Sequence, residues 1–197
     1  MNLRHHLPAI LLIAAALVLR LLTLSGGLPG WWPNVSPLLA LAFVGAVLLP
    51  GMWRWAVLPA LVAVDLFSGG LSMEYIGLGF LTYACLAGAI LWGCSCQGKV
   101  SGLGVIGRLL GASVAFYLIT NTASWMLSPA YAKTASGWVQ ALTVGLPGFP
   151  PTWSFFRNSL LSDVGFGVLL LAAHNLGLPA ARQSLRLPWV GGSQASA

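Results

Sequence analysis

The scarcity of charge constrains this chain more than any other feature of its sequence. Nine Lys and Arg and three Asp and Glu residues make up 6% of the 197 residues, whereas soluble domains average about 25%. Hydrophobic residues account for 58% of the chain, and the mean hydropathy is +0.87. A globule of 20.6 kDa has too small an interior to hide that much apolar surface from water. We therefore predict an all-α, polytopic membrane helix bundle.

Gly, Pro and charged residues divide the apolar sequence into five to six transmembrane helices. The six candidate ranges are 8–24, 36–50, 53–68, 75–93, 103–126 and 155–178. The second and third are short for about 30 Å of hydrocarbon, so a tilted or partly re-entrant hairpin is the alternative for this pair. Pro59 is expected to bend the third. Residues 1–187 are predicted to form one transmembrane domain, and residues 188–197 a disordered tail.

The positions of the cations predict the orientation in the membrane. Cytoplasmic loops are enriched in Lys and Arg, and a cytoplasmic N-terminus places most of the cations inside. These are Arg4, Arg54, Lys99, Arg108, Arg182 and Arg186. We predict a multi-pass protein of the bacterial inner (plasma) membrane with both termini in the cytoplasm. The cations are dispersed rather than gathered in a basic stripe, so membrane lipid is an expected partner and nucleic acid is not.

Polar residues within the predicted spans collect toward the predicted outer side. Helical periodicity places Asn158, Ser159, Ser162 and Asp163 on one face of the last span. The fifth span has a similar face, formed by Ser113, Tyr117, Thr120, Asn121, Ser124 and Trp125. Because polar and charged groups inside a membrane face a partner or a water-filled space, these faces predict a water-accessible cavity that opens outward.

Two intramembrane carboxylates and one arginine leave a second interpretation open. Arg20 and Asp65 lie in the outer halves of their spans, at a depth similar to that of Asp163. An Arg20–Asp65 or Arg20–Asp163 ion pair would satisfy both charges without a ligand. Hydrogen bonds between helices would likewise only hold the bundle together, at about 0.6 kcal/mol per contact.

The predicted outside loop, 127–153, is longer than a connection requires. Its middle, 134–146, is predicted to form an interfacial helix that carries Trp138 into the headgroup region. Long ordered loops often serve as lids or binding elements. An aromatic loop that rests on the membrane surface is the alternative.

No catalytic, metal or cofactor motif is recognisable in the sequence. Neither Asp65 nor Asp163 lies in the Tyr-Asp or Gly-x-Gly-Asp context of an intramembrane aspartyl protease. Cys94-Ser95-Cys96 lacks the two-residue spacer of a redox or zinc pair. Gly77-Leu78-Gly79 does not continue into a phosphate-binding loop. We predict a protein that is not an enzyme and has neither a metal site nor a cofactor.

Several short motifs resemble a family of uncharacterised bacterial membrane proteins with six spans. They are the stretch 34–42 (Asn-Val-Ser-Pro-Leu-Leu-Ala-Leu-Ala), the stretch 121–125, Tyr131, Thr134, Gly137, Pro147, Asn158 and Asp163. That family is similar in fold to the substrate-binding S components of energy-coupling-factor (ECF) transporters. The resemblance implies an outward-facing small-molecule site, with an ATPase and a transmembrane coupling subunit as partners. Ala9, Ala14, Ala15 and Ala16 depart from the Ala-x-x-x-Ala pattern that many S components use for docking.

Two functional hypotheses follow. The first is a membrane solute-binding or transport subunit, in which Arg20 binds an anion or pairs with Asp65 and aromatic side chains stack on a ring of the ligand. The second is a structural scaffold subunit of a cell-envelope complex, with an internally paired polar cluster and a closed cavity. For the first, the predicted substrate-binding residues are Arg20, Asn34, Asp65, Asn121, Trp125, Tyr131, Trp138, Asn158 and Asp163.

Overall fold

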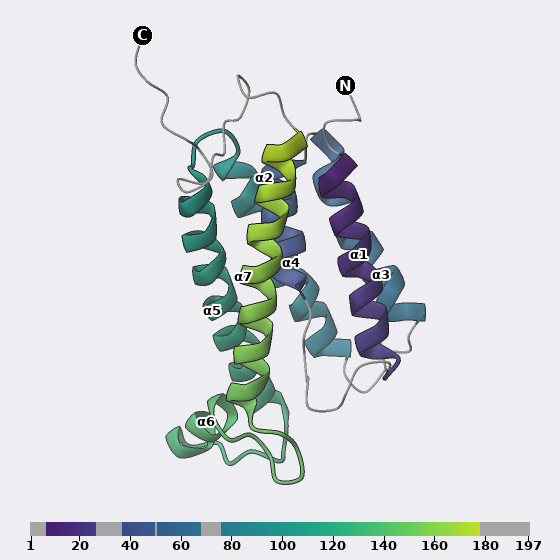
Figure 1. Cartoon of the computed structure of the whole chain (residues 1–197). Coiled ribbons are helices and arrows are strands. Elements are labelled where there is room, and N and C mark those ends of the chain that lie inside the picture. Colours follow the sequence, from purple (N-terminus) through teal and green to yellow (C-terminus); the bar gives the residue numbers. More distant parts are fainter. Residues whose placement is uncertain (1–6, 27–36, 50, 68–75, 178–197) are drawn as a thin grey trace.

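The computed structural model describes residues 7–26, 37–49, 51–67 and 76–177, which form helices and turns (Figure 1). The elements are α1 (Leu7–Leu24), η2 (Ala40–Val44), α2 (Gly45–Leu48), η3 (Gly51–Trp55), α3 (Val57–Phe67), α4 (Ile76–Cys96), α5 (Gly102–Leu127), α6 (Ala135–Leu142) and α7 (Thr152–Gly177). Helices α1, α3 and α5 run in one direction, and α4 and α7 run in the other (Figure 1). The predictions for Asn34 and for the tail at 188–197 lie outside the described residues.

Within the described part of the chain, three helices are long and apolar enough to cross a membrane. They contain the stretches Gly77–Cys96, Gly102–Leu127 and Thr152–Asn175, and α1 contributes a shorter apolar stretch, Ile13–Leu22. Large apolar side chains such as Leu91, Leu110 and Leu161 are exposed on their outer surfaces. Such a surface suits contact with lipid tails. The chain is thus a multi-pass membrane protein, as the charge content predicts.

The second and third predicted spans are only half as long as a membrane is thick. Residues 38–48 are helical, with a π-helical stretch at Ala40–Val44, and α3 has 11 residues. Each therefore rises about 16 Å, against a hydrocarbon thickness of about 30 Å. Pro59 lies in the first turn of α3, where an N–H has no intrahelical acceptor. Pro59 therefore belongs to the start of this helix, not to a bend within it.

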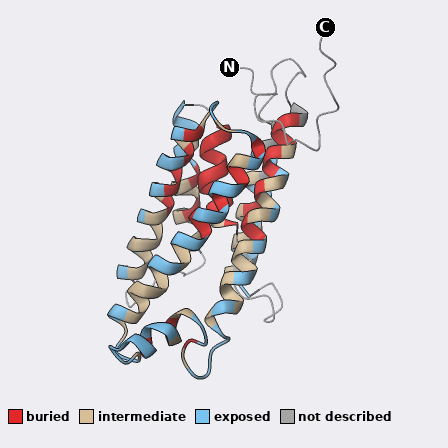
Figure 2. Cartoon of the chain, turned by 90° about the vertical axis from the view of Figure 1, so that its left-hand side faces the viewer, coloured by how far each residue is buried: buried red, intermediate tan, exposed pale blue. Residues whose placement is uncertain are grey.

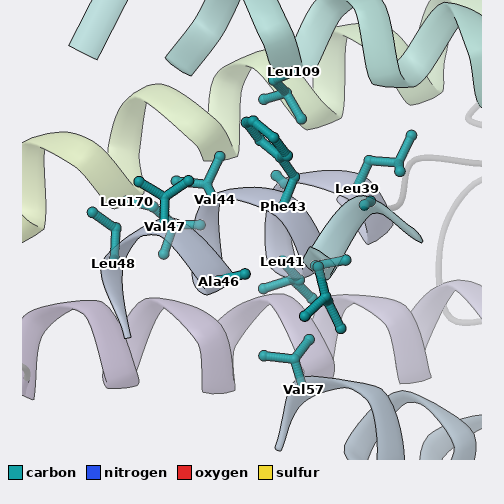
Figure 3. Close-up of a cluster of buried hydrophobic side chains, with 14 of the residues drawn as sticks. Leu39, Leu41, Phe43, Val44, Ala46, Val47, Leu48, Val57, Leu109 and Leu170 are labelled. Carbon is teal, nitrogen blue, oxygen red and sulfur yellow. The ribbon is translucent and has the colours of Figure 1, made fainter. Parts of the chain in front are cut away.

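The helical segment 38–48, here called the central half-helix, forms the core of the bundle. Its residues from Leu39 to Leu48 are all buried, and Leu109 of α5 and Leu170 of α7 join the same cluster (Figure 3). A Cβ atom at Gly93 of α4 would lie 2.5 Å from the carbonyl oxygen of Phe43. Only glycine therefore allows α4 to approach the central half-helix so closely.

Burial is unequal along the bundle axis. Buried residues concentrate toward the end where α1 begins and α7 ends, whereas the end that carries α6 is mostly intermediate or exposed (Figure 2). Trp53 and Trp55 are exposed on η3, and Trp138 and Trp153 are exposed near α6. Tryptophans near both ends of a helix bundle are typical of two membrane interfaces. The loosely packed end is the one at which a cavity opens.

Candidate functional site

A cavity of about 460 Å³ lies between α5 and α7 at the α6 end of the bundle. This volume falls within the range of small-molecule sites, about 300 to 1,000 Å³. Residues of the two helices, of the segment between α6 and α7, of the 128–134 loop and of the central half-helix line it. They are Leu39, Ser113, Phe116, Tyr117, Thr120, Asn121, Tyr131, Gly145, Leu146, Phe149, Pro150, Thr152, Phe155, Phe156, Ser159, Leu160 and Asp163.

Asp163 closes the inner end of the cavity and is 2% exposed. Its Oδ1 accepts hydrogen bonds from the backbone N–H groups of Leu39 and Ala40, each at 3.1 Å. Its Oδ2 accepts a hydrogen bond from the Ser113 hydroxyl at 3.0 Å. The N–H of Leu41 donates to the carbonyl of Pro37, so Leu39 and Ala40 occupy the second and third positions of the half-helix. Pro37 has no side-chain acceptor, and Asp163 supplies the N-terminal cap from α7.

Aromatic rings form much of the cavity wall. Tyr117 and Phe156 are stacked, with ring centroids 4.4 Å apart and an interplanar angle of 28°. The Tyr117 hydroxyl donates to the carbonyl of Leu142, which ties α5 to the end of α6. Burial raises the pKa of the Tyr131 phenol, so this lining group is neutral at pH 7. Ring surfaces with a few directional polar groups suit a small organic molecule that contains a ring.

Trp125 and Trp138, the two tryptophans predicted to bind substrate, do not line the cavity. They hold the neighbouring loop in place. Trp125 Nε1 donates to the carbonyl of Ala132 at 2.8 Å, and Trp138 Nε1 donates to Thr122 Oγ1 at 3.0 Å. The Lys133 ammonium donates to the carbonyls of Trp125 and Ser128 at the end of α5. These bonds fold the 128–134 segment back on α5 and place α6 across the end of the bundle.

Local sequence fixes the start of α6. The Thr134 side chain accepts a hydrogen bond from the N–H of Gly137 at 3.2 Å and caps the helix. A Cβ atom at Gly137 would lie 2.0 Å from the carbonyl oxygen of Ala132. Glycine at this position therefore permits the tight return of the chain into α6. The helix covers Ala135–Leu142, a shorter stretch than the predicted 134–146.

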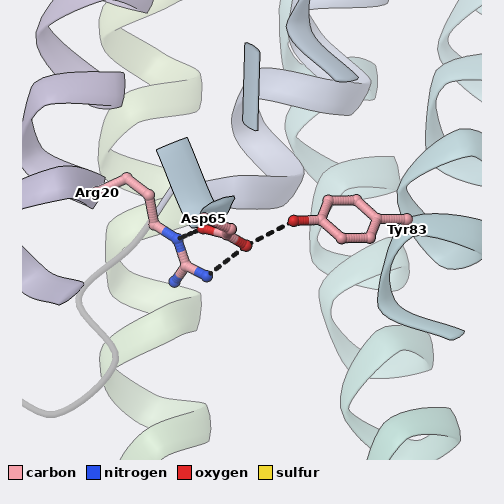
Figure 4. A network of polar contacts seen from close by, with 3 residues as sticks. All are labelled: Arg20, Asp65 and Tyr83. Carbon is pink, nitrogen blue, oxygen red and sulfur yellow. Dashed lines mark hydrogen bonds and ion pairs between the residues drawn. The ribbon is translucent and has the colours of Figure 1, made fainter. Parts of the chain in front are cut away.

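Arg20 and Asp65 form a separate polar network (Figure 4). Arg20 Nε lies 3.1 Å from Asp65 Oδ1, and its Nη2 lies 3.2 Å from Oδ2. The Tyr83 hydroxyl of α4 donates to Oδ2 at 2.6 Å. Of the two ion pairs that the sequence left open, the structure contains Arg20–Asp65. Neither residue lines the cavity, and the partner Tyr83 was not identified from the sequence.

The predicted site residues therefore do not form a single cluster. Asn121, Tyr131 and Asp163 line the cavity, whereas Asn158 accepts a hydrogen bond from Arg157 Nε at 3.1 Å and is not among the lining residues. The reason is geometric, because the part of α7 that lines the cavity consists of two adjacent rows at i, i+4 and i+8 spacing. These rows are Thr152, Phe156 and Leu160, and Phe155, Ser159 and Asp163. The polar face predicted from periodicity is turned away from the first row and includes Asn158, which lies outside both rows.

The predicted substrate-binding residues omit two kinds of group found at the cavity. Ser113, Tyr117 and Thr120 share the predicted α5 face with Asn121, so periodicity was a usable signal for them. The backbone N–H groups of Leu39 and Ala40 gave no such signal. Their availability depends on a helix that begins within the bundle, and side-chain chemistry does not reveal that start.

Comparison with known proteins covers nearly the whole chain. A family described only as of unknown function, DUF6580, matches residues 2–184. No curated protein matches the sequence. No solved structure matches it. The matched range includes every described helix and every residue that lines the cavity. The chain therefore belongs to the DUF6580 family, whose function is unknown.

Proposed function

We propose that this chain is a membrane-embedded binding subunit that captures a small molecule in the cavity at its α6 end. The subunit performs no catalytic chemistry and passes its ligand across the membrane with the help of partner subunits. One observation carries the proposal: the cavity extends from the α6 end to a buried carboxylate that caps the central half-helix.

The depth of the cavity favours a binding role over simple packing. Its lining follows α7 from Thr152 to Asp163, a rise of about 16 Å and thus about half of the hydrocarbon thickness. Helix ends that face a polar site at mid-membrane depth are a recurring feature of transporters. Polar groups at such depth are costly, and they usually line substrate paths.

The partners in this proposal come from the resemblance to ECF S components. Transport against a gradient needs energy, and the sequence has no ATP-binding motif of its own. An ATPase and a transmembrane coupling subunit would supply it. Surrounding lipid completes the expected partners.

The proposed orientation places the cavity outside and both termini in the cytoplasm. A cysteine in place of Ala135 at the start of α6 is expected to react with a membrane-impermeant thiol reagent in intact cells. A cysteine in place of Lys99, between α4 and α5, is expected to react only after lysis. Both positions are exposed, and Cys85, Cys94 and Cys96 are first replaced by Ala. Labelling of position 99 alone in intact cells would place the cavity on the cytoplasmic side.

Ligand capture is tested by filling the cavity. Purified protein is analysed by mass spectrometry for co-purified metabolites, and metabolites are then screened by thermal shift. Thr120→Phe is expected to lower affinity for any ligand found by about tenfold or more, because a ring replaces a small lining side chain. Leu118→Phe is the matched control, since Leu118 lies on the same helix, is exposed and does not line the cavity. A ligand that binds both variants like the wild type occupies another place, and the proposal would then be wrong.

The scaffold alternative has one observation in its favour. Arg20, Asp65 and Tyr83 satisfy one another without a ligand, as an internally paired cluster would. A scaffold subunit predicts that neighbouring genes encode cell-shape proteins. A transport subunit predicts neighbouring genes for an ATPase and a coupling subunit.

A further inference from the structure

We infer that the cavity takes a ring-bearing organic cation, such as an amine or quaternary ammonium attached to an aromatic ring. The inference rests on the proposed function and names the chemical class of its ligand. It follows from the charges, the ring surfaces and the hydrogen bonds of the described lining residues.

The described cavity lining contains a group that can carry a negative charge and none that can carry a positive charge. Asp163 is the only Asp or Glu in the described lining, and no Lys, Arg or His is part of it. The N-terminus of a helix carries about half a positive elementary charge, so it offsets only part of the Asp163 charge. A bound cation therefore gains Coulomb energy here, and a bound anion loses it.

The groups that would hold an anion are already occupied within the chain. The first N–H groups of the central half-helix donate to Asp163. Arg20 is paired with Asp65. Lys133 donates to backbone carbonyls, and the Arg157 guanidinium lies 5.2 Å from the Trp153 ring centroid and is exposed. An anionic ligand would thus have to displace an internal partner.

The cavity also offers what a cation with a ring needs. Phe116, Phe155 and the stacked pair of Tyr117 and Phe156 present ring surfaces to it, and aromatic faces attract cations electrostatically. Among the described residues, the Ser113 hydroxyl is the one donor to Asp163 Oδ2. A carboxylate oxygen has two lone pairs, so Oδ2 can accept a further N–H from a ligand at the inner end of the cavity.

A matched series of ligands isolates charge from ring shape. Tryptamine, tryptophol and indole-3-acetate share the indole ring and are cationic, neutral and anionic at pH 7. Their affinities for the purified wild-type protein are measured by isothermal titration calorimetry in the same detergent. Tryptamine is expected to bind about tenfold more tightly than tryptophol, and indole-3-acetate most weakly of the three. Indole-3-acetate binding most tightly, equal affinities, or no binding of tryptamine would each overturn the inference.

Two variants test whether the charge of Asp163 sets this order of ligand affinities. Asp163→Asn keeps an acceptor for the two backbone N–H groups but removes the charge, so the preference for tryptamine over tryptophol is expected to fall to about twofold or less. Asp65→Asn makes the same change outside the cavity and should leave the preference intact. An unchanged preference in Asp163→Asn would show that this carboxylate does not set the ligand charge.

The inference and the proposed function fail in different ways. If indole-3-acetate binds best and Thr120→Phe abolishes its binding, the cavity is a ligand site of the wrong charge. The inference is then wrong and the proposed function stands. If Thr120→Phe changes the binding of no ligand, both are wrong.

Discussion

Asp163→Ala is expected to lower the free energy of unfolding by about 2 to 5 kcal/mol. A somewhat smaller loss is expected when the Arg20–Asp65 ion pair is broken. The substitution removes the acceptor of three hydrogen bonds at once, from Leu39, Ala40 and Ser113. The three donor residues are buried, so a replacement acceptor could come only from the cavity. The central half-helix would lose its N-terminal cap, and it forms the core of the bundle.

Graded substitutions separate this cap from a general effect of mutation. Asp163→Asn retains one oxygen acceptor and should cost about 1 kcal/mol, and Ser113→Ala removes a single hydrogen bond at a similar cost. Ser162→Ala is the control, because this neighbouring hydroxyl is buried and has no hydrogen-bond partner within the described part of the chain. It should change the free energy of unfolding by less than about 0.5 kcal/mol.

Unfolding by SDS in mixed micelles, followed by circular dichroism, measures all four variants. If Asp163→Ala unfolds like Ser162→Ala, the carboxylate does not hold the half-helix. The described contacts of Asp163 would then be unimportant for stability.

Arg20→Leu and Asp65→Leu are each expected to lower the free energy of unfolding by about 2 to 4 kcal/mol, whereas the double variant loses only about 1 kcal/mol. Each single variant leaves one charge without its partner in a place where the two side chains are only 14% and 13% exposed. The double variant removes both charges and fills the space with apolar groups. The coupling energy between the two positions should therefore be about 3 kcal/mol or more.

Tyr83→Phe provides the reference for this cycle. It removes the 2.6 Å hydrogen bond to Asp65 but leaves the ion pair in place, so it should cost about 1 kcal/mol. The same SDS titration yields all the free energies. If the costs of the two single variants simply add in the double variant, the ion pair does not couple α1 to α3.

The long helices were predictable from the sequence because their signal is local. The predicted spans 75–93, 103–126 and 155–178 match α4, α5 and α7 to within three residues at each end. Each depends on an uninterrupted apolar run, which a bilayer stabilises as a helix whatever its neighbours are. The N-terminal cap of α6 also depends on local sequence, because the residues that form it, Thr134 and Gly137, lie three positions apart.

Local sequence did not show which polar residues would pair with one another. The sequence placed Arg20, Asp65 and Asp163 at similar depth but could not say which helix lies beside which. Only the packing of α1 against α3 brings Arg20 to Asp65. Of the two roles predicted for Arg20, anion binding or pairing with Asp65, the structure contains the second.

The sequence by itself determined the membrane class, the three long helices and the polar faces of α5 and α7, because composition and helical periodicity carry that information within each segment. The sequence placed the start of the second helix within two residues, at 36 against 38, but only the tertiary structure shows what caps it. Pro37 offers no side-chain acceptor, and the cap comes from Asp163, which lies 124 residues after Leu39 in the chain. A cap supplied by so distant a residue has no local signature. The inner end of the cavity therefore emerges only when α7 packs against the central half-helix.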